Sequence, residues 1–349
     1  MIAPNWLGDA VMALPALSDL RRGQPDASIS IAARPSVAPL FTLVRDVDEV
    51  ITLRDDQPWP LAGREVALLL PNSFHSALML ARARIPERWG YRTDWRGLLL
   101  TRAVPRPSSS LHQVEYYQQL VRALGFPSSA AAPRLPVTSD LRDSGARTLR
   151  QAGWDGQMPL VALAPGAAFG SAKRWPPHAF ADLAAGLAEE GIGVVLVGAA
   201  ADRDTASAVI ADSSGRATFI DLVGRTDVPG LAAVLVNCRA LVGNDSGALH
   251  LAAALGVNVT AVFGPTNERL TAPVAGEQWP VAGGSEITVH RPPTTDHRPP
   301  PTGHRPPLVT VLTHAVWCRP CQLRDCPLDH ACMHGIGVPS VLDATRRML

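Results

Sequence analysis

Short apolar runs alternate along this chain with longer segments of helical periodicity. In the first half the runs predict buried strands, and the segments between them predict helices: strands at 29–33, 50–53 and 66–70, helices at 11–22 and 73–84. The second half repeats the pattern more clearly, with strands at 160–164, 194–197, 219–222, 240–242 and 259–263, and helices at 178–190, 202–210, 228–237 and 248–255. Alternating strands and helices predict an α/β fold with doubly wound parallel sheets.

The two halves suggest two Rossmann-like domains joined by a linker. Three prolines lie within 127–136, and a short amphipathic helix is predicted near 141–152. We therefore expect an N-terminal domain over 1–150, a C-terminal domain over 151–335 and a final helix over 336–349. Ligands of such sheets bind beyond the carboxyl ends of the strands, so we expect the site in the cleft between the domains.

Composition narrows the class of protein. The chain has 349 residues, 46% of them hydrophobic, which is too apolar for a disordered chain. Its net charge of +1 gives no overall electrostatic attraction to nucleic acid, so no nucleic-acid partner is expected. No apolar run reaches the roughly 18 residues of a membrane span, and residues 1–9 do not resemble a signal peptide. These features favour a soluble, cytoplasmic protein.

The first candidate site lies near the start of the chain. Gly8 follows a short apolar segment and precedes a predicted helix, so a ligand could approach its backbone closely. Asp9 would then begin the helix and point toward the ligand, or it would serve only as a helix cap. Residues 1–4 are shorter than the usual strand of about five residues, so the first strand is expected to be incomplete. Pro15 is expected to kink the helix that follows or to lie close to its first turn.

Two further motifs follow predicted strands of the second half. Lys173 and Arg174 come after the strand and loop that contain Gly166, and cations there suit a phosphate, although they could be solvated surface charges. Residues 244–250 (NDSGALH) open a helix. Its first amide groups and its dipole favour an anion. The residues of this motif that could take part are Asp245, Ser246, Gly247 and His250. Helix capping is the alternative for the first two.

Two segments near the C-terminus depart from the α/β pattern. The motif His-Arg-Pro-Pro occurs three times at a spacing of seven residues, and we expect a Pro-rich loop without regular structure over 288–308. The segment 317–334 holds four cysteines at the spacing C-x₂-C-x₄-C-x₅-C: Cys318, Cys321, Cys326 and Cys332. They could form a structural zinc site, with His330 or His334 as alternative ligands, or remain reduced thiols in a packed loop. Cys238 is expected to be a small buried hydrophobic residue.

Several of these motifs together resemble a known family. Residues 4–17 (PNWLGDAVMALPAL) are similar to the opening of the lipopolysaccharide heptosyltransferases, glycosyltransferase family 9. Residues 90–101 (GYRTDWRGLLLT) resemble the heptosyltransferase II branch in particular. The resemblance extends to 164–167 (APGA), 173–176 (KRWP), 244–250, and 317–321 (WCRPC) with Cys326 and Pro327.

The resemblance implies a GT-B fold, an ADP-heptose donor, a lipid A–inner-core acceptor, and neither a catalytic metal nor a cofactor. It implies that Asp9 is the general base, and that Asn5, Trp6 and Arg92 contact the acceptor. It assigns the donor to a set of residues in the second domain: Gly166, Lys173, Arg174, Asp245, Ser246, Gly247 and His250. The expected location is cytoplasmic, peripheral to the inner face of the inner membrane.

Other functions stay open at this point. A family 9 transferase could use another acceptor or another sugar. A protein that binds a nucleotide sugar without turnover is an alternative from a different class. Release of ADP from ADP-heptose, compared with ADP-glucose, would separate these possibilities.

Overall fold

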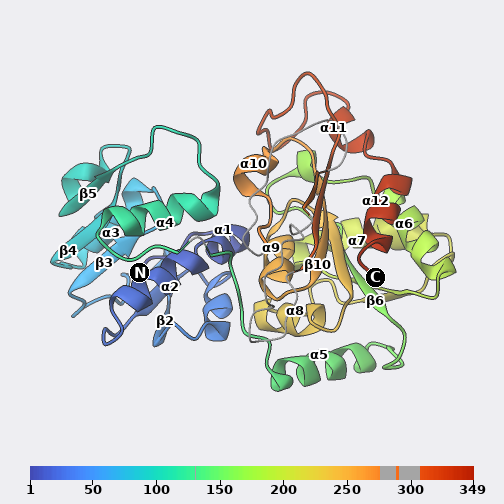
Figure 1. Ribbon diagram of the computed structural model, residues 1–349, viewed down its shortest axis with the longest axis horizontal. Helices are drawn as coiled ribbons and strands as arrows, with labels where there is room; N and C mark the ends of the chain where they lie inside the picture. The colour runs from blue at the N-terminus through green and yellow to red at the C-terminus, as the bar shows by residue number, and fades with distance from the viewer. Residues whose placement is uncertain (130, 276–287, 291–306) are drawn as a thin grey trace, which may run out of the picture. The chain divides into compact units, whose positions relative to one another are not determined.

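The computed structural model describes residues 1–129, 131–275, the backbone of 288–290, and residues 307–349. The chain divides into two compact units, Met1–Pro133 and Arg134–Leu349 (Figure 1). The observed boundary follows Pro133, within the proline-containing linker, and not residue 150 as expected. The reason is that α5 (Ser139–Gln151) packs on α8 (Val228–Leu235) of the second unit, where Arg142 and Asn237 hydrogen-bond across the contact.

The first unit contains one parallel sheet whose centre is the start of the chain. Ile2 bridges Ala32 on one side and Leu69 on the other. It thereby joins the pair β1 (Ser30–Ala33) and β2 (Glu49–Thr52) to β3 (Val66–Leu69), β4 (Glu87–Arg92) and β5 (Arg102–Pro105). The start of the chain thus contributes one bridging residue, Ile2, to the sheet. The last two strands were not predicted from the sequence.

One of the two helices expected in the first unit, 73–84, is confirmed, the other, 11–22, is divided, and the helix at 113–123 was not predicted. The expected helix over 11–22 is two helices, α1 (Leu7–Met12) and α2 (Leu14–Gly23), because Pro15 has no amide hydrogen to continue the ladder. Helix α2 packs on α4 (Gln113–Ala123). The remaining helices of this unit are η1 (Ala38–Leu43), α3 (Phe74–Arg82) and η2 (Arg96–Leu99).

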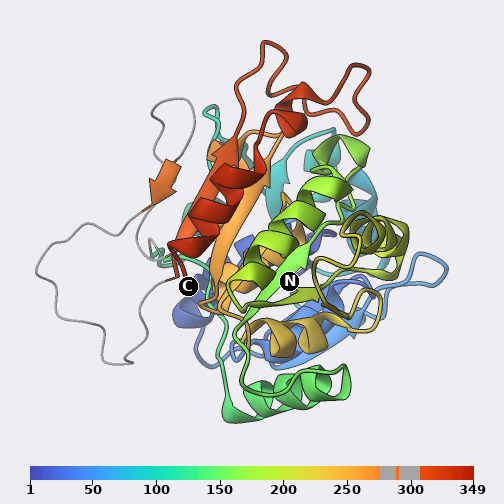
Figure 2. The ribbon, with the colours of Figure 1, turned by 90° about the vertical axis from the view of Figure 1, so that its right-hand side faces the viewer.

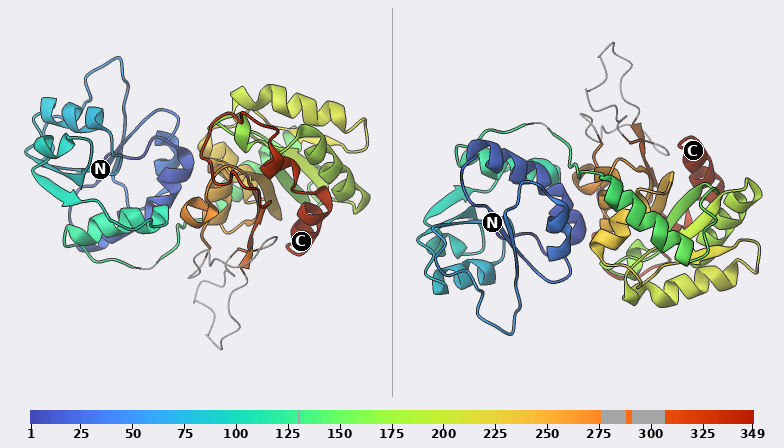
Figure 3. Two further views of the ribbon diagram at one scale, coloured as in Figure 1. Left: turned by 90° about the horizontal axis from the view of Figure 1, so that it is seen from above. Right: turned by 90° about the horizontal axis from the view of Figure 1, so that it is seen from below.

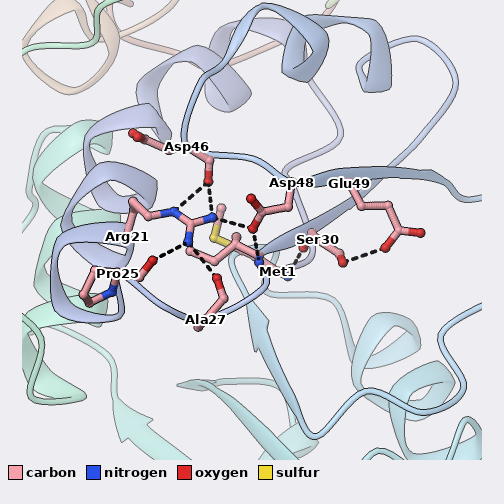
Figure 4. A network of polar contacts seen from close by, with 9 residues as sticks. Met1, Arg21, Pro25, Ala27, Ser30, Asp46, Asp48 and Glu49 are labelled. Carbon is pink, nitrogen blue, oxygen red and sulfur yellow. Dashed lines mark hydrogen bonds and ion pairs between the residues drawn. The ribbon is translucent and has the colours of Figure 1, made fainter.

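One arginine ties the end of α2 to the neighbouring loops (Figure 4). The guanidinium of Arg21 donates to the carbonyl of Ala27 at 2.6 Å and to the backbone oxygen of Asp46, and it pairs with the Asp48 carboxylate at 2.5 Å. Asp48 also accepts the amide hydrogen of Ile29, at the entry to β1. A basic residue in the last turn of a helix suits the helix dipole, and here it also holds two loops in place.

The second unit contains a seven-stranded sheet in the order β11-β12-β10-β9-β6-β7-β8. These strands are β6 (Leu160–Ala164), β7 (Gly193–Leu196), β8 (Phe219–Asp221), β9 (Ala240–Asn244), β10 (Asn258–Phe263), β11 (Thr288–His290) and β12 (Val309–Thr313). All pairings are parallel except that of β11 with β12. Leaving out β11, the order is that of a Rossmann sheet, and the strand order reverses between β6 and β9.

Helices cover this sheet, and the C-terminal helix is part of its core. Helix α12 (Val338–Arg346) lies beside α6 (Pro177–Glu189) (Figure 2). Trp175 is fully buried between them, and its indole donates to the Ile336 carbonyl at 2.9 Å. The other helices are η3 (Ser171–Lys173), η4 (Ala200–Asp202), α7 (Arg203–Asp212), α9 (Gly247–Ala254), α10 (Glu268–Thr271) and α11 (Ala331–His334) (Figure 3).

The segment 288–308, expected to be a Pro-rich loop without regular structure, begins with a strand. Its first residues, Thr288–His290, form β11, and the Leu308 amide donates to the side chain of Asn258 at 2.9 Å. Residues 291–306 lie outside the described residues. Within the described ranges, no helix has both the length and the apolar character needed to cross a bilayer.

Candidate active site

Asp9 lies in the first turn of α1 and is half-buried. Trp6, not Asp9, occupies the helix cap position, so the capping alternative does not describe this carboxylate. The side chain lies close to Tyr117, which is buried in α4. Burial, and after it the negative charge of Asp9, raise the pKa of the Tyr117 hydroxyl well above its ordinary value. The Asp9 carboxylate therefore lies near a buried tyrosine.

The three residues assigned to the acceptor lie at the carboxyl edge of the first sheet. Asn5 and Trp6 directly follow the central Ile2 position, and both are exposed. The Asn5 side chain accepts a hydrogen bond from Arg34 at 3.1 Å. Arg92 ends β4, two strands away in the same parallel sheet, and it is exposed. The sheet thus brings all three to one edge, where ligands of such sheets bind.

A buried ion pair occupies the switch point of the second sheet. The Lys173 ammonium lies 2.5 Å from the Asp245 carboxylate, and the two side chains are 12% and 7% exposed. Thr266, at the end of β10, donates its hydroxyl to the same carboxylate oxygen at 2.7 Å. The loops after β6, β9 and β10 therefore converge on one carboxylate, at the strand ends where the topology predicts a ligand.

Asn244 fixes the loop that carries Lys173. This residue is fully buried; its side-chain oxygen accepts the Trp175 amide at 2.9 Å, and its side-chain nitrogen donates to the Pro165 carbonyl at 2.7 Å. The Asn244 side chain, at the end of the neighbouring strand β9, thus holds both ends of the loop between residues 165 and 175. The sequence placed Asn244 in the motif but did not reveal this positioning function.

The start of α9 contains an unpaired polar atom. Ser246 is the cap residue in an extended conformation, yet its side chain makes no capping hydrogen bond. Its hydroxyl oxygen is buried and has no hydrogen-bond partner among the described residues. Gly247 begins the helix, whose first amide groups lack intrahelical acceptors. An anion at this position would satisfy the hydroxyl and the helix end together. His250 lies one turn further along and is buried.

The backbone of Gly166 lies very close to an acidic side chain. A Cβ atom there would lie 2.1 Å from the carboxylate carbon of Asp202, whose oxygen accepts the Ala199 amide at 3.0 Å. The end of β7 thus brings an acidic side chain against the loop after β6. Arg174 is half-buried, and its Nε has no partner among the described residues. Lys173 and Arg174 are not the fully solvated charges that the alternative interpretation required.

A contact that the sequence did not reveal links this loop to the Cys-rich segment 317–334. The Ala172 amide donates to the Arg324 carbonyl at 2.9 Å, and the Ser171 hydroxyl donates to Asp325 at 2.7 Å. The ring of Phe169 lies under two cations, Lys173 at 4.7 Å and Arg324 at 5.3 Å. The Cys-rich segment therefore forms one support of the loop that holds Lys173.

The four cysteines of this segment are free thiols. Cys332 is buried, and burial, followed by the nearby thiols, raises its pKa. Among the residues that the structure describes, no three His, Cys, Asp or Glu side chains are arranged to hold a metal ion. The zinc site and the packed reduced thiols both stay predictions for this segment. Cys238 is buried as expected, and burial raises the pKa of its thiol to about 12.

Comparison with known proteins places these features in a family. The model of the family described as glycosyltransferase family 9 (heptosyltransferase) matches residues 61–290. The lipopolysaccharide heptosyltransferase 2 of Escherichia coli K12 is 32% identical over 304 residues, which cover 79% of this chain and 85% of that protein. The chain belongs to glycosyltransferase family 9.

Solved structures agree with the assignment to family 9. The structure of the E. coli ADP-heptose lipopolysaccharide heptosyltransferase II matches with a TM-score of 0.77 and 26% identity, covering 99% of this chain and 97% of that one. An E. coli heptosyltransferase with ADP matches in fold, with a TM-score of 0.62 and 20% identity over 78% of this chain and 89% of that one. The predicted α/β fold of GT-B type and the predicted glycosyltransferase activity are confirmed.

Proposed function

We propose that this family 9 glycosyltransferase transfers heptose from ADP-heptose to a heptose already present on the inner core of lipopolysaccharide, with inversion at the anomeric carbon. The similarity to heptosyltransferases 2 supports the choice of donor and acceptor. The observation that carries the proposal is the Lys173–Asp245 pair at the switch point, next to the buried Ser246 hydroxyl, which has no partner in the described parts of the chain.

The donor half of the site would act on the diphosphate. As the bond between the anomeric carbon and the β-phosphate oxygen breaks, negative charge grows on the departing ADP. Lys173 and the first amides of α9 supply positive charge at that place, and the Ser246 hydroxyl supplies a hydrogen bond. Arg174 is the second cation of this loop. Groups that stabilise charge present mainly in the transition state raise kcat, and not only the affinity for the donor.

The acceptor half would use Asp9 as general base. Its carboxylate takes the proton of the acceptor hydroxyl while that oxygen forms the new bond to the anomeric carbon. The reaction then yields the extended core, ADP and one proton, which leaves Asp9 to solvent. The proposal requires the carboxyl edges of both sheets to face the substrates. Asn5, Trp6 and Arg92 are the proposed contacts to the acceptor.

The place of action follows from the substrates. A nucleotide sugar is a water-soluble donor, whereas the lipid A–inner-core acceptor is held in a membrane. We therefore propose that the protein works in the cytoplasm, peripheral to the inner face of the inner membrane. The mechanism uses no organic cofactor and assigns no step to a metal ion.

The test is ADP release from the purified protein. ADP-heptose and ADP-glucose are each offered with two acceptors, one carrying the first heptose and one lacking it. We expect ADP release only from ADP-heptose with the heptose-bearing acceptor. Release with the other acceptor, or from ADP-glucose, would assign a different family 9 activity. Tight binding of ADP without release from either donor would contradict transfer altogether.

A further inference from the structure

Two large apolar side chains project from one short turn of the first unit. Trp95 is 87% exposed and Leu98 is 88% exposed. Both belong to the turn that contains η2, between the parallel strands β4 and β5. Such exposure of a tryptophan and a leucine within four residues costs free energy in water, because neither side chain is removed from solvent. Stability of the fold does not account for them.

The backbone of this turn adds a second cost. Trp95 has φ of 61°, in the left-handed region that glycine or asparagine adopts with less strain. A turn shaped only by stability would carry one of those residues at position 95. Strain of this kind persists where the surroundings impose it, and it is often found at functional positions.

A buried arginine holds the turn in place. Arg96 is fully buried; its guanidinium donates to the Tyr91 carbonyl at 2.8 Å, to the Asn72 side chain at 3.2 Å and to the Pro71 carbonyl. Thr93 also reaches the Asn72 carbonyl. Trp95 and Leu98 therefore belong to a turn that the hydrogen bonds of a buried arginine hold in place.

The sequence of the turn and its neighbouring strands is rich in arginine, although Asp94 lies in the turn itself. Residues 82–106 contain seven arginines and only two acidic residues, whereas the whole chain has a net charge of +1. Two of these arginines contact the turn itself. Arg88 donates to the Leu99 carbonyl at 2.7 Å, and the stem of Arg92 lies so close to Gly97 that a Cβ atom there would be 2.8 Å from it. One of the acids, Glu87, is hydrogen-bonded to Trp89 and Thr101.

We propose that the turn of residues 93–99 binds the surface of an anionic lipid bilayer, with Trp95 and Leu98 inserted at the interface. Tryptophan is favoured at the boundary between head groups and acyl chains, and arginines beside it pair with anionic head groups. An acidic protein or a nucleic acid would match the arginines but not the two exposed apolar side chains. The proposal rests on the membrane-bound acceptor proposed above, and it adds the element that makes the contact.

The first experiment measures sedimentation of the full-length protein with vesicles, without donor or acceptor. Vesicles of phosphatidylglycerol and phosphatidylethanolamine are compared with vesicles of phosphatidylcholine. The variant is Trp95→Asn with Leu98→Ser; asparagine is chosen because it tolerates the left-handed backbone. The matched control is Trp317→Asn with Leu328→Ser in the second unit, where the tryptophan is 88% and the leucine 54% exposed.

We expect the wild type to bind the anionic vesicles and to lose binding at high salt. The Trp95/Leu98 variant should bind at least about tenfold more weakly, because the apolar area that would enter the membrane is gone. The Trp317/Leu328 control should bind like the wild type. Equal binding of wild type and the Trp95/Leu98 variant would overturn the proposal, as would a loss of the same size in the control.

A second measurement keeps the result clear if the double variant unfolds. Lipids with brominated acyl chains should quench more tryptophan fluorescence in the wild type than in Trp95→Phe, and equal quenching would refute insertion of Trp95. ADP release with a soluble, delipidated acceptor should be unchanged in the double variant; a loss there would assign the turn to the acceptor sugars instead. Because vesicle binding uses no substrate, its outcome stands even if the proposed transfer fails.

Discussion

Replacing Lys173 with methionine tests whether the pair at the switch point is both structural and catalytic. The change removes the ammonium that lies 2.5 Å from Asp245 and leaves a stem of similar length against Phe169. The Asp245 carboxylate, only 7% exposed, would then keep the Thr266 hydroxyl but lose its positive partner. An uncompensated buried charge of this kind is the source of the expected loss of stability.

The size of the effect follows from burial. Removing one member of a buried pair costs about 3–5 kcal/mol, and the retained Thr266 hydrogen bond places this case near the lower end, at about 3 kcal/mol. For a unit of the size of Arg134–Leu349, that loss lowers Tm by about 6–12 °C. Lys173→Met combined with Asp245→Asn should recover much of it, because the neutral amide no longer needs a cation.

Two assays are required, since stability alone would not reveal chemistry. Calorimetric unfolding of both single variants and the double variant measures the coupling between the side chains. ADP release measures transfer, and there kcat should fall about 10²- to 10³-fold in Lys173→Met and stay low in the double variant. Additive changes in Tm would refute the buried-pair argument. Near-normal kcat in the folded double variant would remove Lys173 from the proposed mechanism.

Three further predictions address the other parts of the site. Asp9→Asn should lower kcat about 10²- to 10⁴-fold while calorimetric ADP binding stays unchanged, because an amide cannot accept the proton; normal turnover would exclude Asp9 as the base. Arg324→Ala should raise the KM for ADP-heptose about two- to fivefold, since it frees Phe169 within the loop that carries Lys173, whereas Arg150→Ala, which also unstacks an arginine from an aromatic ring, should not. Metal analysis of untagged protein should find no more than about a tenth of an equivalent of zinc or iron, with the thiols of 317–334 free to react, and a full equivalent would contradict the thiol interpretation.

The fold was predictable where strands are wholly apolar. The strand at Leu160–Ala164 was predicted to the residue, because a fully buried parallel strand reads as one hydrophobic run. Strands β4 and β5 were missed because their sequences, ERWGYR and RAVP, are rich in arginine, and several of those side chains stay exposed. Val309–Thr313 was not predicted, although its β-branched residues are typical of a strand.

The sequence predicted which side chains gather at the candidate site, but not which of them interact with one another. Each motif follows a strand, so the rule for parallel sheets already brings Lys173 and Asp245 to one edge. The sequence could not show that the two side chains form an ion pair, because that depends on the order β9-β6 in the sheet. Nor could it show that the Ser246 hydroxyl has no partner among the residues that the structure describes, since capping by serine is the usual outcome at such a position.

The C-terminal segment helps to fix the position of the loop after β6. A loop of this length that carries a cation would lose much of its electrostatic effect if it moved, because catalysis depends on preorganised charge. Here the loop is held from within the sheet by Asn244 and from outside by the backbone of Arg324 and the side chain of Asp325. The supports are separated from the loop by about 70 and 150 residues of sequence. No local pattern encodes such distant contacts, so a site of this kind is recognised from its motifs and understood only from the fold.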